Sequence, residues 1–255
     1  MKIAVCIKQV PTREWQPRLT DDRKYIREQD ASWELNEPDA YALEEALRLR
    51  EAQSGEVVVC AAGPARVAQV IREALARGAD RAIHVDDDTL ASADGAAIAD
   101  TLAAAMREEA FDLILTGLQS DDQGFAQVGV ILAERLGLPH ATIIMEVNVD
   151  ASAAGLRVKR ELEGGWFQWV EMPTPAVLTI QSGINQLRYA TLKGIMAAKK
   201  KEIRRVSVSS PIVRRQEILG LYVPQKTKQT EMISGSPGEA AATLVRKLRE
   251  DARAI

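Results

Sequence analysis

The sequence predicts an α/β fold built on a doubly wound, mostly parallel sheet. Short apolar runs alternate with segments of helical spacing through the first half of the chain, which is typical of strand–helix–strand units. Such units cross over in the right-handed sense, and this places helices on both faces of the sheet. The length of 255 residues, with 46% apolar and 27% charged residues, suits one large globular domain with appendages.

Each expected element has its own local signal. A short apolar run with no polar interruption is typical of a buried parallel strand, and such runs occupy residues 3–7, 56–62, 81–85, 111–115, 141–149 and 176–180. Apolar residues at helical spacing occupy residues 39–51, 65–76, 93–108 and 123–136. Gly63-Pro64 ends the second strand, Gly78 suits a left-handed cap on the second helix, and Gly137 with Pro139 stops the fourth helix.

The pattern changes in the second half of the chain. Residues 156–162 and 166–171 flank Gly164-Gly165, and their alternation predicts an antiparallel hairpin with one polar face. Residues 206–235 have little periodicity and predict an extended arm. Ser236 as N-cap, with Pro237 and Glu239, starts a helix that we expect to reach residue 252. We therefore divide the chain into an α/β domain at 1–205 and a C-terminal arm with a helix at 206–255.

Bulk properties exclude several classes of function. A formal charge of −3 does not predict a nucleic acid or an anionic membrane as partner. The N-terminus enters a strand without a signal-peptide pattern, and no apolar run approaches the ~18 residues of a membrane span, so we expect a cytoplasmic protein with no membrane insertion. Cys6 and Cys60 lie in apolar runs and are expected to be buried free thiols, which agrees with a reducing compartment.

The loop after the fourth expected strand is the first candidate binding site. It lies at a strand carboxyl end and opens a helix, where free amides and the helix dipole favour a phosphate. The alternative is an ordinary helix start capped by Ser or Asp, which the local pattern alone favours. The candidate cofactor-binding residues in this loop are Gly117, Leu118, Gln119, Ser120, Asp121, Asp122, Gln123, Gly124, Phe125, Ala126, Gln127 and Val128.

A second candidate site precedes the first helix. Asn36 could read a base edge or a sugar hydroxyl, but the local pattern by itself favours an N-cap turn with a proline near the first helical position. Ligands of doubly wound sheets bind beyond the strand carboxyl ends, so one nucleotide can span both loops. The candidate residues at this part of the edge are Cys6, Asn36, Glu37, Pro38, Asp39 and Ala62.

Residues 184–205 combine large apolar side chains with three consecutive lysines. A buried connection has no use for the lysines, and a solvated loop has no use for the apolar groups. We therefore expect this segment to project outward and meet another protein. Its candidate partner-binding residues are Tyr189, Leu192, Ile195, Met196, Lys199, Lys200 and Lys201.

No sequence pattern indicates a catalytic site or a metal-binding site. The sequence has no CxxC or Cys/His grouping and no Ser/His/Asp arrangement, so we assign no catalytic residue. Asp86-Asp87-Asp88 could hold a divalent cation, but we favour a solvated turn. The doubly wound sheet alone would also fit a stress-type ATP-binding module, although that module would not need residues 184–205 or the arm.

Taken together, the motifs resemble the beta (small) subunit of electron transfer flavoproteins over nearly the whole chain. The most specific part is the stretch at 188–201, read as Arg-Tyr-Ala-Thr-Leu followed by Ile-Met and then Ala-Lys-Lys-Lys. The opening strand at 4–11, the helix after Asn36, the nucleotide loop and the hairpin at 158–165 also match that family.

The resemblance implies an adenine-nucleotide alpha-hydrolase-like fold and a heterodimer with an alpha subunit that holds a redox-active FAD. It implies that this chain binds AMP at the sheet edge and performs no bond chemistry. A leucine matching Leu192 would anchor acyl-CoA dehydrogenases or similar flavin dehydrogenases, and the arm would pack on the alpha subunit. The alternative within the family is a bifurcating subunit in which a second FAD replaces AMP.

Two departures from the family pattern bear on these expectations. Gly124 and Phe125 stand where the family usually has an acidic residue and where bifurcating members usually have Thr. Phe125 either excludes a second flavin or stacks on an adenine. Lys193-Gly194 replaces a Pro-Asn dipeptide found in many members, and the glycine changes the backbone freedom of the loop.

Overall fold

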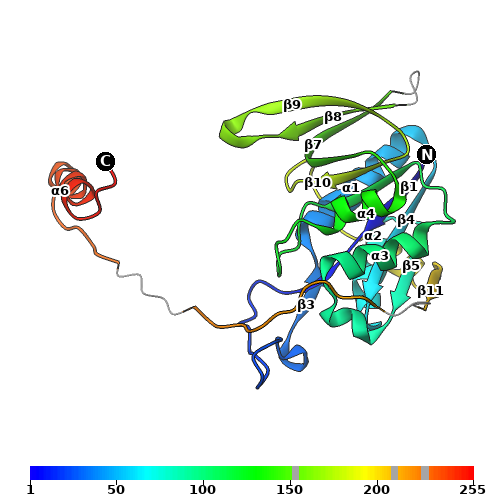
Figure 1. Ribbon diagram of the computed structural model, residues 1–255. Helices are drawn as coiled ribbons and strands as arrows, with labels where there is room; N and C mark the ends of the chain where they lie inside the picture. The colour runs from blue at the N-terminus through cyan, green and yellow to red at the C-terminus, as the bar shows by residue number, and fades with distance from the viewer. Residues whose placement is uncertain (151–154, 208–211, 225–229) are drawn as a thin grey trace. The chain divides into compact units, whose positions relative to one another are not determined.

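The computed structural model describes residues 1–150, 155–207, 212–224 and 230–255, and within them the main sheet has nine strands (Figure 1). Their order across the sheet is β11-β5-β4-β1-β6-β10-β7-β8-β9. The bounds are β1 (Lys2–Cys6), β4 (Glu56–Gly63), β5 (Arg81–Asp86), β6 (Leu113–Gly117), β7 (His140–Asp150), β8 (Gly155–Glu161), β9 (Phe167–Pro173), β10 (Ala176–Ile180) and β11 (Ile203–Val206). Pairing is parallel from β11 to β7 and antiparallel from β7 to β9.

The predicted fold class is therefore confirmed, including the hairpin that extends the sheet. The helices are α1 (Glu37–Gln53), α2 (Ala68–Arg77), α3 (Gly95–Met106), α4 (Val128–Leu136), α5 (Leu192–Ala198) and α6 (Pro237–Glu250). Short 3-10 turns occupy Glu28–Asp30, Ala65–Val67, Asp88–Ser92 and Glu163–Gly165. None of the helices described here is long and apolar enough to cross a membrane.

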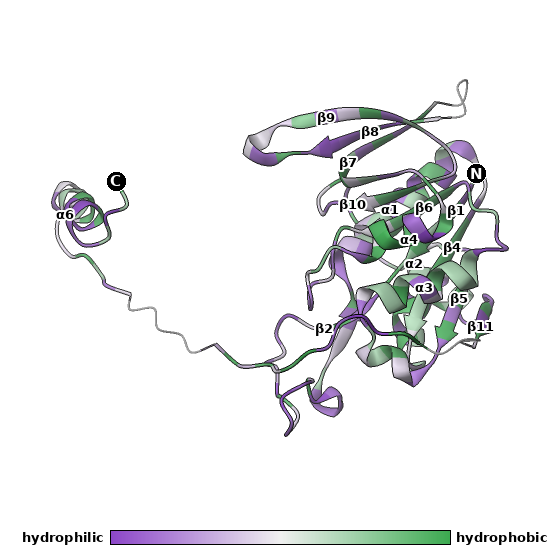
Figure 2. Ribbon diagram, viewed as in Figure 1, coloured by the Kyte–Doolittle hydropathy of each residue, from purple (hydrophilic) through white to green (hydrophobic). Residues whose placement is uncertain are grey.

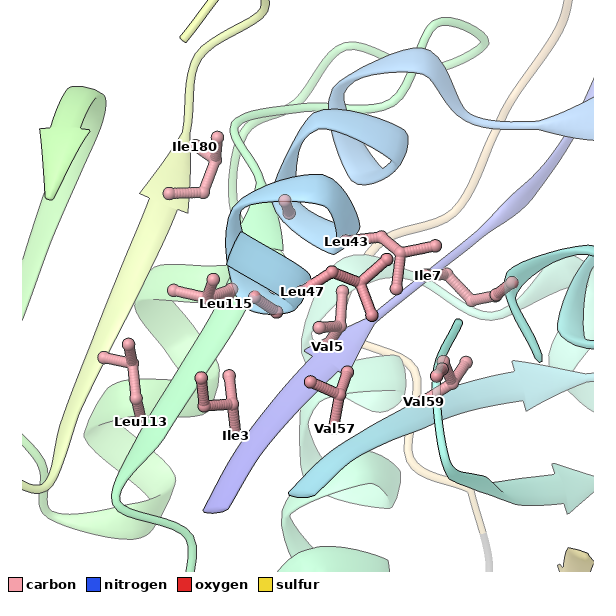
Figure 3. Packing of buried hydrophobic residues seen from close by; sticks show 14 of the residues in the cluster. Ile3, Val5, Ile7, Leu43, Leu47, Val57, Val59, Leu113, Leu115 and Ile180 are labelled. Atoms are coloured by element: carbon pink, nitrogen blue, oxygen red, sulfur yellow. The ribbon is translucent and has the colours of Figure 1, made fainter. Parts of the chain in front are cut away.

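Each face of the sheet carries its own apolar core. On one face α1 and α2 bury leucine and isoleucine side chains against β1, β4 and β6; Figure 3 shows Leu43 and Leu47 of α1 over Val5 and Val57. On the opposite face α3 and α4 cover Ala4, Cys60 and the other buried side chains of the strands that point to that face. The central strands are accordingly hydrophobic along their length (Figure 2). These strands are continuous apolar runs because helices cover both faces of the sheet.

Several features differ from the sequence-based expectation, among them helix α5, which was not predicted within the segment at 184–205. The fourth helix starts at Val128, whereas we expected residue 123, because the backbone before it is in the left-handed region at Gly124 (φ 65°) and Ala126 (φ 53°). A two-stranded antiparallel sheet, β2 (Gln9–Pro11) with β3 (Trp33–Leu35), was not predicted. Strand β11 was also not predicted, and it extends the sheet beside β5.

The chain divides into two compact units, Met1–Leu221 and Tyr222–Ile255. The described start of the arm belongs to the first unit: Asp94 accepts hydrogen bonds from the backbone amides of Arg215 and Gln216. Within the second unit, α6 begins with the expected capping box between Ser236 and Glu239. The proposed role of the arm in subunit association stays a prediction.

The amino end of the parallel strands is held by one carboxylate with three cationic neighbours. Glu109 lies 2.9 Å from Lys2 Nζ, 2.7 Å from Arg81 Nη2 and 2.7 Å from Arg204 Nη2. Hydrogen bonds from Arg81 and Lys2 hold the pKa of Glu109 at about 2, below its ordinary 4.5. Since the pKa is lower in the folded chain, the stability from this group is present above pH 4.5 and is lost as the pH falls toward 2.

We predict that Glu109→Gln lowers the free energy of unfolding at pH 7 by about 2 kcal/mol, because three cations lose their counter-charge. The variant should also lose less stability than the parent between pH 4.5 and pH 2. Urea unfolding at several pH values measures both effects. Glu108→Gln, at the exposed neighbouring position, is the control. Equal stability of the two variants at pH 7 would contradict the stabilising role of Glu109.

Candidate nucleotide-binding edge and docking segment

The carboxyl ends of β1 and β6 meet the amino end of α1 at a buried carboxylate. Asp39 accepts a hydrogen bond from the Lys8 amide at 2.7 Å and from the Gly117 amide at 2.9 Å. The approach is so close that a Cβ on Gly117 would lie 2.4 Å from Asp39 Oδ1. Burial raises the pKa of Asp39 to about 7, although the amide donors favour its ionised form. Asp39 thus ties two strands to one helix.

Asn36 connects the same helix start to the expected nucleotide loop. Its Nδ2 donates to Gln119 O at 3.0 Å, and its Oδ1 accepts from the Asp121 amide at 2.9 Å. Asn36 occupies the N-cap position of α1 but makes no side-chain cap bond to that helix. The side chain is buried, so it shapes the loop from beneath. The expected contact of Asn36 with a base edge or a sugar stays a prediction.

The structure brings the two predicted loops together at one edge of the sheet. Of the predicted residues, Cys6, Asn36, Pro38, Asp39 and Gly117 are buried, and they form the floor. Half-buried side chains surround that floor, and these are Glu37, Ala62, Leu118, Ser120, Gln127 and Val128. The exposed members are Gln119, Asp121, Asp122, Gln123, Gly124, Phe125 and Ala126. The exposed loop is therefore the part of the edge that is open to a ligand.

The start of α4 has no side-chain cap bond from its N-cap residue, which is Gln127. The interpretation as an ordinary Ser- or Asp-capped helix is therefore wrong for α4, whereas α3 does have such a cap from Asp94. The first-turn amides of an uncapped helix lack intrahelical partners, and they favour a negatively charged group.

Two cations at this edge were missed by the sequence analysis. Lys8 Nζ lies 2.7 Å from Asp122 Oδ1 and donates to Ser120 Oγ at 3.3 Å, so it holds the loop against the end of β1. Arg13 pairs with the carboxylates of Glu37 and Asp121. The sequence did carry a signal for Lys8, because it directly follows the strand predicted at residues 3–7. Polar side chains at that position lie at the edge of the sheet where ligands bind.

The thiols and the acidic run show no reactive arrangement. Burial raises the pKa of both Cys6 and Cys60, so both remain protonated thiols. Asp87 accepts a hydrogen bond from the Thr89 amide and caps a 3-10 turn, as expected for a turn. Within the described ranges, no group of three or more His, Cys, Asp or Glu side chains is placed to hold a metal ion.

The segment at 184–205 presents apolar side chains to solvent, as predicted. The exposed fraction is 89% for Tyr189, 84% for Leu192 and 62% for Met196, and Ile195 is also exposed. Its first part is fixed to α1, because Arg188 pairs with Glu44 at 2.7 Å and also with Glu51. These ion pairs with α1 therefore stabilise the segment that carries the exposed apolar side chains.

Lys201 differs from the two lysines before it. Lys199 and Lys200 are exposed, whereas Lys201 is half-buried and donates to Leu75 O and Ala79 O. Only the first two lysines are thus placed for the partner contact that we expected of all three.

The chain is similar in sequence to known proteins over nearly its whole length. The model of the electron transfer flavoprotein domain matches residues 25–211. The chain is 36% identical to the electron transfer flavoprotein subunit beta of Methylophilus methylotrophus over 261 residues, which cover 98% of each chain. It is 30% identical to the protein of the same name from Bacillus subtilis over 262 residues, which cover all of both chains. A third relative of that name, from Thermoanaerobacterium thermosaccharolyticum, is 34% identical over 97% of this chain.

We predict that Gly117→Ala lowers the free energy of unfolding by about 2 kcal/mol, because the added methyl group overlaps Asp39 and forces the strand end away from α1. Gly220→Ala is the control, since a Cβ at Gly220 meets no atom within 4 Å. Chemical denaturation of both variants gives the comparison. A fully stable Gly117→Ala protein would show that the close approach is not required.

Proposed function

Because the chain belongs to the electron transfer flavoprotein family, as a beta-type subunit, we propose that it binds AMP at the edge formed by Asn36, Asp39 and the loop at 117–128. In this proposal it pairs with an alpha subunit that carries FAD. The complex accepts electrons from acyl-CoA dehydrogenase or a similar flavin dehydrogenase. The chain itself positions components for electron transfer and catalyses no bond chemistry.

The observation that carries the proposal is the joined edge described above. Asn36 and Asp39 use their polar atoms to fix the loop and the strand ends, which leaves the loop's exposed face free for a ligand. The uncapped start of α4 supports a phosphate there. The ring of Phe125 is 55% exposed beside it, which supports stacking on an adenine. AMP supplies one phosphate and one adenine, and so matches both features.

The docking part of the proposal rests on the segment at 184–205. Leu192 and its exposed apolar neighbours offer a small anchor, and Lys199 with Lys200 add positive charge at its border. An apolar anchor surrounded by polar groups is the usual composition of a protein-binding hot spot. A stress-type ATP-binding module, the alternative from another class, accounts neither for this segment nor for relatives that match the chain from end to end.

Nucleotide content tests the proposal most directly. The chain is co-expressed with its larger companion subunit, and the nucleotides released on denaturation are counted per complex. We expect one FAD and one AMP. Two FAD and no AMP would replace the proposed shuttle with the bifurcating alternative, in which Phe125 lines a flavin site. A complex without any adenine nucleotide beyond the alpha subunit's FAD would reject the AMP site.

We predict that Leu192→Ala slows electron transfer from the partner dehydrogenase by about tenfold, because one central apolar anchor is removed from the interface. The fold should not change, since the side chain is 84% exposed. The control is Leu162→Ala, where the leucine is 40% exposed and lies outside both the segment at 184–205 and the C-terminal arm. Stopped-flow reduction of the complex measures the rate, and equal rates for both variants would reject the anchor.

A further inference from the structure

The short helix α5 is seated directly on α2. A Cβ on Gly194 would lie 2.3 Å from Ala76 O, so only glycine permits this approach. Ala198 is buried at the other end of α5, with an exposed fraction of 3%. Thr191 caps the start of the helix by accepting a hydrogen bond from the Gly194 amide at 3.0 Å. The backbone of α5 is therefore held at both ends.

Two cations cap the carboxyl ends of α2 and α5 reciprocally. Lys201 Nζ, from beyond α5, donates to Leu75 O at 3.0 Å and to Ala79 O at 2.5 Å, at the end of α2. In return Arg72 of α2 donates to Ala198 O at 2.6 Å and to Lys201 O at 2.9 Å. The last carbonyls of a helix lack intrahelical partners and form its negative end, so cations stabilise them.

The two preceding lysines have no comparable role. In the part of the chain that the structure describes, neither the Lys199 nor the Lys200 ammonium has a carboxylate or carbonyl partner. Burial lowers the pKa of Lys201, and the nearby charge of Asp80 opposes that shift. Three chemically identical neighbours thus occupy two different environments.

We propose that Lys201 is a positioning residue that locks α5 onto α2, unlike Lys199 and Lys200, whose charge contributes only to the docking described under the proposed function. The lock itself rests on contacts within this chain, and its effect on docking rests on the proposed function. The lock keeps the exposed side chains of α5 in place before a partner arrives. A preorganised surface loses less conformational entropy on binding than one that must first become ordered.

Hydrogen exchange on the full-length chain tests the lock without any partner. We expect Lys201→Met to speed amide exchange in residues 192–198 by about tenfold, because two hydrogen bonds from a charged donor are lost. Amides of β4 are the internal reference, so a general loss of stability is recognised by their faster exchange. Lys200→Met is the matched control and should leave α5 unchanged. Equal exchange of α5 in the two variants would overturn the positioning role.

Steady-state reduction of the complex by its dehydrogenase supplies the second readout. Lys201→Met should raise the KM for the complex and leave kcat unchanged, and Lys201→Arg, which keeps a cationic donor, should restore the KM. Lys200→Met should instead weaken the salt dependence of the KM. A lower kcat with an unchanged KM for Lys201→Met would contradict the lock. Faster exchange of α5 without any change in reduction would reject the proposed docking function and retain the lock.

Discussion

The carboxylate of Asp39 is the contact on which the rest of the site depends. Lys8 lies beyond the end of β1 and Gly117 is the last residue of β6, and Asp39 accepts hydrogen bonds from both backbone amides, at 2.7 and 2.9 Å. A buried amide without a partner would cost about 1–3 kcal/mol. Because one side chain of α1 accepts from both amides, α1 fixes the place where the candidate nucleotide loop leaves the sheet.

Local sequence signals were sufficient for the elements that are buried on both faces. The run at residues 56–62 is short, apolar and bounded by glycine and proline, which is typical of a central strand covered by helices on both faces. The start of α4 was harder, because Gln123 and Val128 both fit a helical pattern. Only the left-handed residues Gly124 and Ala126 show where the loop ends, and the alanine carries no such signal in the sequence.

Contacts between distant residues account for what the sequence could not reveal. Asn36 is a typical N-cap residue, and its actual partners lie 83 and 85 positions away in the nucleotide loop. Lys201 belongs to a run that indicates a solvated surface, yet its ammonium reaches carbonyls 122 and 126 positions earlier. Strand β11 is short and half polar, and it forms because β5 offers a parallel edge. None of these partners can be inferred from spacing.

Helix α1 connects the candidate nucleotide-binding edge and the candidate docking segment. Its first turn holds the edge through Asp39, and its later turns hold the segment through the ion pairs of Glu44 and Glu51 with Arg188. A helix of 17 residues is about 25 Å long, and its packing on the sheet keeps it rigid. A nucleotide bound at one end would therefore stabilise the element that supports the docking segment, without itself contacting the partner. This geometry gives a redox-inactive AMP a structural purpose in the proposed function.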